Sequence, residues 1–119
     1  MDAFFSVSIS IIERMFVTLS FFLFLQDAMA MKKVSVIIKG KVQGVFFRAS
    51  AREVALQMGI AGFVRNEPDG SVYIEAEGDK EQLKKFLAWC RKGPPRAFVE
   101  DVQVTEGPIV HFTSFTIDR

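Results

Sequence analysis

The sequence predicts an α+β sandwich in which two helices cover one face of an antiparallel sheet. Two observations predict this class. Over residues 32–119, strand-like and helix-like segments follow one another in the order β-α-β-β-α-β. Turn residues, chiefly Gly, Pro and Asp, separate these segments. This is the order of two split β-α-β units, the ferredoxin-like arrangement, with a short extra strand at the C-terminal end.

The strand segments differ from the helix segments in residue type and in period. β-Branched residues are frequent in the strand segments, whereas the helix segments carry apolar stripes at spacings of three and four. In chain order, the expected elements are a strand at 34–39, a helix at 47–58, strands at 60–65 and 71–77, a helix at 80–92, and strands at 98–105 and 112–117.

Local signals mark where individual elements begin and end. Gly59 stands where the first helix should end, because glycine readily adopts the left-handed conformation that follows a helix. Residues 67–70, Glu-Pro-Asp-Gly, are turn residues and predict a hairpin. Asp79 and Gln82 have the spacing of a capping box, which opens the second helix. Gly93, followed by two prolines, ends it.

Alternation in the strand at 71–77 is clean enough to assign its two faces. Val72 and its apolar partners should face the core, and Tyr73, Glu75 and Glu77 should face water. On the second helix, Cys90 falls on the apolar face, so we expect it to be buried packing rather than a reactive thiol.

Residues 1–30 differ from the rest of the chain and are expected to lie outside the fold. Residues 15–25 contain no charge, but this run is too short to span a bilayer, which takes about 20 apolar residues. Its length suits the core of a signal peptide, although Asp2 and Glu13 outweigh Arg14 in a flank that should be positive. An over-long translation start, a signal or membrane anchor, and a helix packed on the domain all remain open. In each case the predicted domain is 31–119.

Composition argues against several classes of function. The net charge of +1 is too small for a protein that coats nucleic acid. A single cysteine cannot form an internal disulfide, and a single histidine, His111, argues against a metal site built from His and Cys clusters. We expect no nucleic-acid partner, no metal and a cytoplasmic location. Secretion or membrane attachment would require that residues 1–30 act as a signal or anchor.

The loop from Gly40 to Arg48 joins a strand to a helix and predicts a site for an oxyanion. Glycines at 40 and 44 allow tight curvature and close approach of a ligand to the main chain. Main-chain amides at the start of a helix can bind an anion, and a guanidinium can hold two of its oxygens. A purely structural turn with an exposed arginine would fit the same residues.

Asn66 ends a strand just before a turn and is the second candidate. Its side-chain amide offers both a donor and an acceptor, so it could orient a water molecule without taking a proton. An asparagine that bonds only its own turn would fit the same position.

Together the two segments resemble the signature pair of the acylphosphatase family. The first motif, Gly-x-Val-Gln-Gly-Val-x-Phe-Arg, is matched over residues 40–48. The second motif begins Gly-aromatic-Val-basic-Asn and continues, after three residues, with Gly-x-Val; it is matched over residues 62–72 and closed by Gly78. The resemblance covers residues 32–119 and none of residues 1–30.

The resemblance implies a hydrolase of small-molecule acyl phosphates that needs no metal or cofactor. We expect the protein to be a monomer. In the family the motif arginine, here Arg48, binds the phosphate, and the motif asparagine, here Asn66, positions the attacking water. Main-chain amides of the loop share the phosphate; these belong to Gln43, Gly44, Val45, Phe46 and Phe47. A non-catalytic ferredoxin-like module that binds phosphate or another ligand is the alternative.

Overall fold

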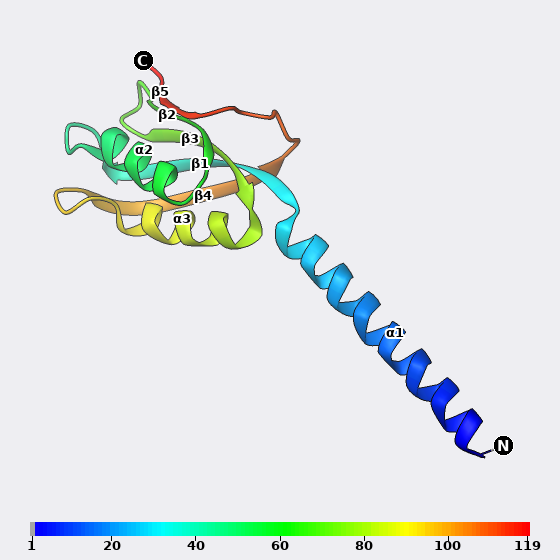
Figure 1. Cartoon of the computed structure of the whole chain (residues 1–119). Coiled ribbons are helices and arrows are strands. Elements are labelled where there is room, and N and C mark those ends of the chain that lie inside the picture. The colour runs from blue at the N-terminus through cyan, green and yellow to red at the C-terminus, as the bar shows by residue number, and fades with distance from the viewer. Residues whose placement is uncertain (1) are drawn as a thin grey trace. The chain divides into compact units, whose positions relative to one another are not determined.

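The computed structural model describes residues 2–119, which divide into two compact units between Ala30 and Met31 (Figure 1). The first unit consists of one helix, α1 (Asp2–Met29). No helix in the described part of the chain combines the length and the apolar character that a membrane crossing requires. The placement of residues 1–30 outside the working domain stays a prediction.

The second unit carries the predicted elements in the predicted order. Their bounds are β1 (Met31–Lys41), α2 (Phe47–Gln57), β2 (Ala61–Asn66), β3 (Val72–Asp79), α3 (Lys80–Lys92), β4 (Phe98–Gly107) and β5 (Phe115–Ile117). Asp79 and Gln82 form both hydrogen bonds of the capping box at the start of α3. Gly59 follows α2 with φ 70°, as a residue after a helix C-terminus commonly does.

Five strands form one mixed sheet in the order β4-β1-β3-β2-β5. The pairs among β1 to β4 are antiparallel, as predicted. The added strand β5 runs parallel to its neighbour β2, so the sheet is not antiparallel throughout. Helices α2 and α3 lie on one face of the sheet, which confirms the ferredoxin-like arrangement (Figure 1).

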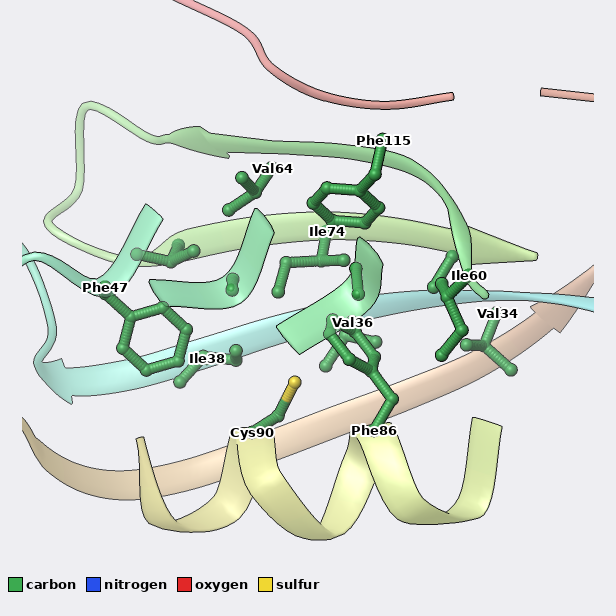
Figure 2. Packing of buried hydrophobic residues seen from close by; sticks show 14 of the residues in the cluster. Val34, Val36, Ile38, Phe47, Ile60, Val64, Ile74, Phe86, Cys90 and Phe115 are labelled. Atoms are coloured by element: carbon green, nitrogen blue, oxygen red, sulfur yellow. The ribbon is translucent and has the colours of Figure 1, made fainter. Parts of the chain in front are cut away.

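The hydrophobic core lies between this sheet face and the two helices. Alternate residues of β1, namely Val34, Val36 and Ile38, are buried there. Phe86 and Cys90 point from α3 toward the sheet (Figure 2). The burial of Cys90 is as predicted, and it raises the pKa of the thiol to about 12.

Glu77 departs from its predicted exposure to water. It lies on the sheet face opposite the helices, as the alternation indicates, but it is only 1% exposed. The main-chain N–H groups of Val110, His111 and Phe112 donate hydrogen bonds to its carboxylate. The segment between β4 and β5 therefore covers this end of β3. Alternation within one strand reports which face a residue is on, but it carries no signal for a distant segment that covers that face.

Candidate active site

The loop between β1 and α2 is anchored to the domain at both of its sides. At the end of β1, a Cβ atom on Gly40 would lie 2.2 Å from the carbonyl oxygen of Phe98, so β4 passes too close for any larger residue. Farther along, the side chains of Val42 and Val45 are buried in the core. The path of the loop is therefore fixed by packing before any ligand is considered.

Two residues of the loop have a left-handed backbone conformation. Gly44 has φ 72° and Phe46 has φ 64°. Glycine adopts this conformation freely, whereas a residue with a Cβ atom is strained by about 1–2 kcal/mol. Turns of this kind can direct successive N–H groups toward one anion. Phe46 is also the N-cap residue of α2, and its side chain makes no capping hydrogen bond. The first N–H groups of α2 therefore receive no hydrogen bond from the side chain of their N-cap residue.

Gln43 joins the loop to the turn that follows β2. Its Nε2 donates hydrogen bonds to the carbonyl oxygens of Glu67, at 2.8 Å, and Ser71, at 2.9 Å. The turn is itself closed, because the carboxylate of Asp69 accepts hydrogen bonds from the N–H and the hydroxyl of Ser71. The side chain of Gln43 therefore holds the loop against the residues that directly follow Asn66.

Arg48 and Asn66 line the same pocket, which has a volume of about 320 Å³. Arg48 lies in the first turn of α2, and Asn66 is the last residue of β2. Gly44, Phe46 and Phe47 line the pocket as well. The loop, the turn after β2 and the end of β5 lie at one end of the domain (Figure 1). The structure thus brings together both predicted side chains and three of the five predicted loop residues.

Gln43 and Val45 are the two predicted loop residues that do not line the pocket. The side chain of Gln43 bonds the neighbouring turn, and that of Val45 is buried. Both side chains brace the loop. The phosphate-binding role of their main-chain amides stays a prediction.

Asn66 presents a buried acceptor to its surroundings. Within the described residues, its Oδ1 atom is buried and has no hydrogen-bond partner. Leaving such an atom unsatisfied typically costs about 1–3 kcal/mol, so most buried acceptors are paired. This acceptor therefore does not serve the turn that follows Asn66, which was the structural alternative for this residue.

The charged side chains among the described residues that line the pocket are those of Arg48 and Arg119. Among the described residues, the ion pairs involve other side chains, and Arg48 has no carboxylate partner. No acidic side chain belongs to the described residues that line the pocket. Arg48, with an unpaired guanidinium, and Asn66, with an unpaired and buried side-chain oxygen, therefore line one cavity. A guanidinium at this position can bind an anion.

Ile117 and Arg119 also line the pocket and were not predicted. They reach it because β5 is parallel to β2. Val64 pairs with Ile117, and the N–H of Asp118 donates to the carbonyl of Val64 at 2.8 Å. The chain therefore continues toward the same end of the sheet as Asn66. A strand of three residues carries too little pattern to reveal its partner or direction from sequence.

The family model and the curated relatives name the same family. The acylphosphatase family model matches residues 34–117. A curated acylphosphatase from Methylococcus capsulatus is 49% identical over 90 residues, covering 75% of this chain and 98% of the relative. Another from Marinobacter nauticus is 46% identical over 88 residues, covering 73% and 96%. The crystal structure of acylphosphatase from Bacillus subtilis has a TM-score of 0.73 at 34% identity, covering 76% of this chain and 100% of that one.

Proposed function

This chain belongs to the acylphosphatase family and hydrolyses acyl phosphates, and we propose that it does so in the pocket that Arg48 and Asn66 share. The substrate is a mixed anhydride of a carboxylic acid and phosphoric acid. Water attacks phosphorus, the bond between phosphorus and the acyl oxygen breaks, and carboxylate and inorganic phosphate are released. The observation that supports this placement is that one cavity is lined by Arg48, whose guanidinium has no partner among the described residues, and by Asn66, whose buried side-chain oxygen has none either.

Arg48 and the loop amides bind the phosphoryl group in this proposal. The planar guanidinium of Arg48 holds two phosphate oxygens, and main-chain N–H groups from Gln43 to Phe47 hold the same group from the loop side. The packing of the loop and its hydrogen bonds to the turn fix these donors in advance. Donors that need no rearrangement stabilise the charge that develops in the transition state most effectively.

Asn66 orients the attacking water. Its Oδ1 accepts a hydrogen bond from that water and directs the oxygen lone pair at phosphorus, in line with the leaving carboxylate. No histidine, cysteine or acidic side chain belongs to the described residues that line the pocket. The proton of the water therefore passes to a phosphate oxygen of the substrate itself. The carboxylate is a good leaving group, so the mechanism includes no protein acid.

A non-catalytic module that binds phosphate is the alternative. It would use Arg48 and the loop in the same way. It would have no use for the unsatisfied Oδ1 of Asn66, which is costly to keep buried. This atom favours the enzyme over the binding module. We further propose that residues 31–119 are the catalytic unit, since the family match lies wholly within them.

Hydrolysis of benzoyl phosphate by the full chain, in EDTA, tests this assignment. We expect Arg48→Ala to reduce kcat/KM by at least about 10²–10³, the usual loss for one preorganised donor. Arg91→Ala, which removes an exposed arginine of α3 outside the pocket, is the matched control and should retain near-normal turnover. Arg48→Lys should recover little, because an ammonium cannot hold two oxygens in a plane.

Near-normal turnover by a folded Arg48→Ala protein would refute the placement of the site. Dependence of activity on added divalent metal would refute the assignment of the cationic role to Arg48. The same assay on residues 31–119 tests whether they suffice as the catalytic unit.

A further inference from the structure

We propose that the side chain of Phe46 forms the wall of the pocket against which the acyl group lies, and that it favours substrates with a bulky apolar acyl group. The inference deepens the proposed function and rests on it, because an acyl subsite matters only if the phosphoryl group is held at Arg48. The role concerns the ring of Phe46 and is separate from that of its main-chain amide.

Two consecutive phenylalanines of the loop have opposite surroundings. Phe47 is 2% exposed and contacts Trp89, with ring centroids 5.3 Å apart. Phe46 is 69% exposed. The ring of Phe47 therefore belongs to the core, whereas the ring of Phe46 contributes little to it. A single exposed apolar side chain is common on protein surfaces and carries no argument alone.

The backbone of Phe46 supplies a second observation. Its φ of 64° is strained for any residue with a Cβ atom, and the same loop uses glycine where the chain adopts a similar φ, at Gly44. The loop therefore holds an exposed aromatic ring at a position where a glycine would be relaxed. Strain of this kind persists at sites where the side chain is needed for something other than stability.

The pocket lining places Phe46 beside the two polar residues of the proposed site. Phe46 lines the pocket with Arg48 and Asn66, and so do Ile117 and Arg119. In the proposed mechanism Arg48, the loop amides and Asn66 surround the phosphoryl group and the water. The acyl group is joined to phosphorus through one oxygen. It must therefore contact the other residues that line the pocket.

Arg119 is cationic, and the other remaining side chains of the lining are apolar: Val42, Phe46, Phe47, Ala49 and Ile117. Val42 and Phe47 are buried in the core, whereas Phe46 is the most exposed large apolar side chain of this set. An aromatic or branched aliphatic acyl group can pack on the face of the Phe46 ring and exclude water from it. A small acyl group such as acetyl offers little surface for this contact. The pocket therefore favours bulky apolar acyl groups over small ones.

The ratio of kcat/KM for benzoyl phosphate to kcat/KM for acetyl phosphate measures this preference. We expect Phe46→Ala and Phe46→Gly to lower the ratio about three- to tenfold, the range of a typical aromatic contact. Phe46→Tyr, which keeps the ring, should preserve it. Phe98→Ala is the matched control, because Phe98 is also an exposed phenylalanine, at 65%, but lies outside the pocket.

Each outcome decides between the two proposals. An equal fall for both substrates in Phe46→Ala would show that the ring only shapes the loop, and would overturn the acyl subsite while leaving the proposed function intact. A ratio equal to that of wild type would do the same. A full-length wild-type protein that hydrolyses neither substrate, or an Arg48→Ala protein that hydrolyses both normally, would remove the proposed function and the acyl subsite with it.

Discussion

The side-chain Nε2 of Gln43 lies 2.8 Å from the main-chain oxygen of Glu67. This hydrogen bond connects a loop at the start of α2 with the residue that follows Asn66 at the end of β2. The second bond from the same atom, to Ser71, closes the connection on the other side of the turn. The loop and the end of β2, which carries Asn66, are thus held next to each other, although they belong to separate elements.

Replacing Gln43 by leucine tests the importance of this relation. The loss of two hydrogen bonds should lower the free energy of unfolding by about 1–3 kcal/mol. It should also reduce kcat by about 10- to 100-fold, because a shift of about 1 Å between reacting groups can have an effect of that size. Urea unfolding and steady-state kinetics with benzoyl phosphate measure the two effects. Gln103→Leu, which removes only an exposed bond to Asp101, is the control. Reduced stability with unaltered kcat would show that the connection is only structural.

Replacing Asn66 by alanine separates water orientation from phosphate binding. We expect kcat to fall about 10²–10³-fold while the inhibition constant for inorganic phosphate changes little. Asn66→Asp keeps an acceptor at the same place but adds a negative charge, so it should weaken phosphate binding. Kinetics with phosphate as a competitive inhibitor provide both values. The water-orienting role would be wrong if Asn66→Ala lost phosphate binding but kept its kcat.

Glu77 should make the stability of the domain dependent on acid pH. Burial alone would raise the pKa of this carboxyl, but hydrogen bonds from the N–H groups of Val110, Phe112 and His111 outweigh burial and hold the pKa below its ordinary value of 4.5. A lowered pKa contributes stability at pH values above 4.5, and that contribution is lost as the pH falls through the pKa of the folded state.

The substitution Glu77→Gln isolates this contribution. At pH 7 it should lower the free energy of unfolding by about 1.5–3 kcal/mol, the usual strength of a hydrogen bond to a charged group. The difference from wild type should shrink as the pH falls below 4.5. Urea unfolding from pH 7 to pH 3 measures it, with Glu100→Gln, an exposed position on β4, as the control. A difference that stays constant over this range would mean that the charge of Glu77 is not involved.

Cys90 should be unreactive in the folded protein. Its thiol is buried and has a pKa of about 12, so very little thiolate is present at pH 8. An aromatic disulfide reagent should label it slowly under native conditions and rapidly in urea. Rapid labelling of the folded protein would show that α3 opens readily or that this part of the core is less well packed.

The elements of the fold could be predicted from sequence because their signals are local. The capping box of Asp79 and Gln82 and the alternation of β3 each lie within a few residues. The structure confirms the capping box, and it confirms the alternation as far as Ala76. The sequence also predicts that Arg48 and Asn66 belong to one site, because the two motifs that contain them resemble the signature pair of one family. The structure brings the two residues together, and their catalytic roles stay proposals.

The features that sequence did not reveal depend on the return of the chain after β4. The cover over Glu77 comes from residues 110–112, which follow β4 and lie far from β3 in the chain. Ile117 and Arg119 reach the pocket through the parallel pairing of β5 with β2. Both effects arise from the path of an irregular segment, for which neither hydrophobic period nor turn chemistry gives a position.

The parallel course of β5 also bears on how the protein can be handled. Because the strand directs the residues after Ile117 toward the pocket, any affinity tag or fluorescent fusion joined behind Arg119 would emerge beside the pocket that Arg48 and Asn66 line. Such additions would crowd the pocket and add foreign charge next to the proposed phosphate-binding site. Kinetic constants measured on C-terminally tagged protein would then reflect the effect of the tag as well as the activity of the enzyme.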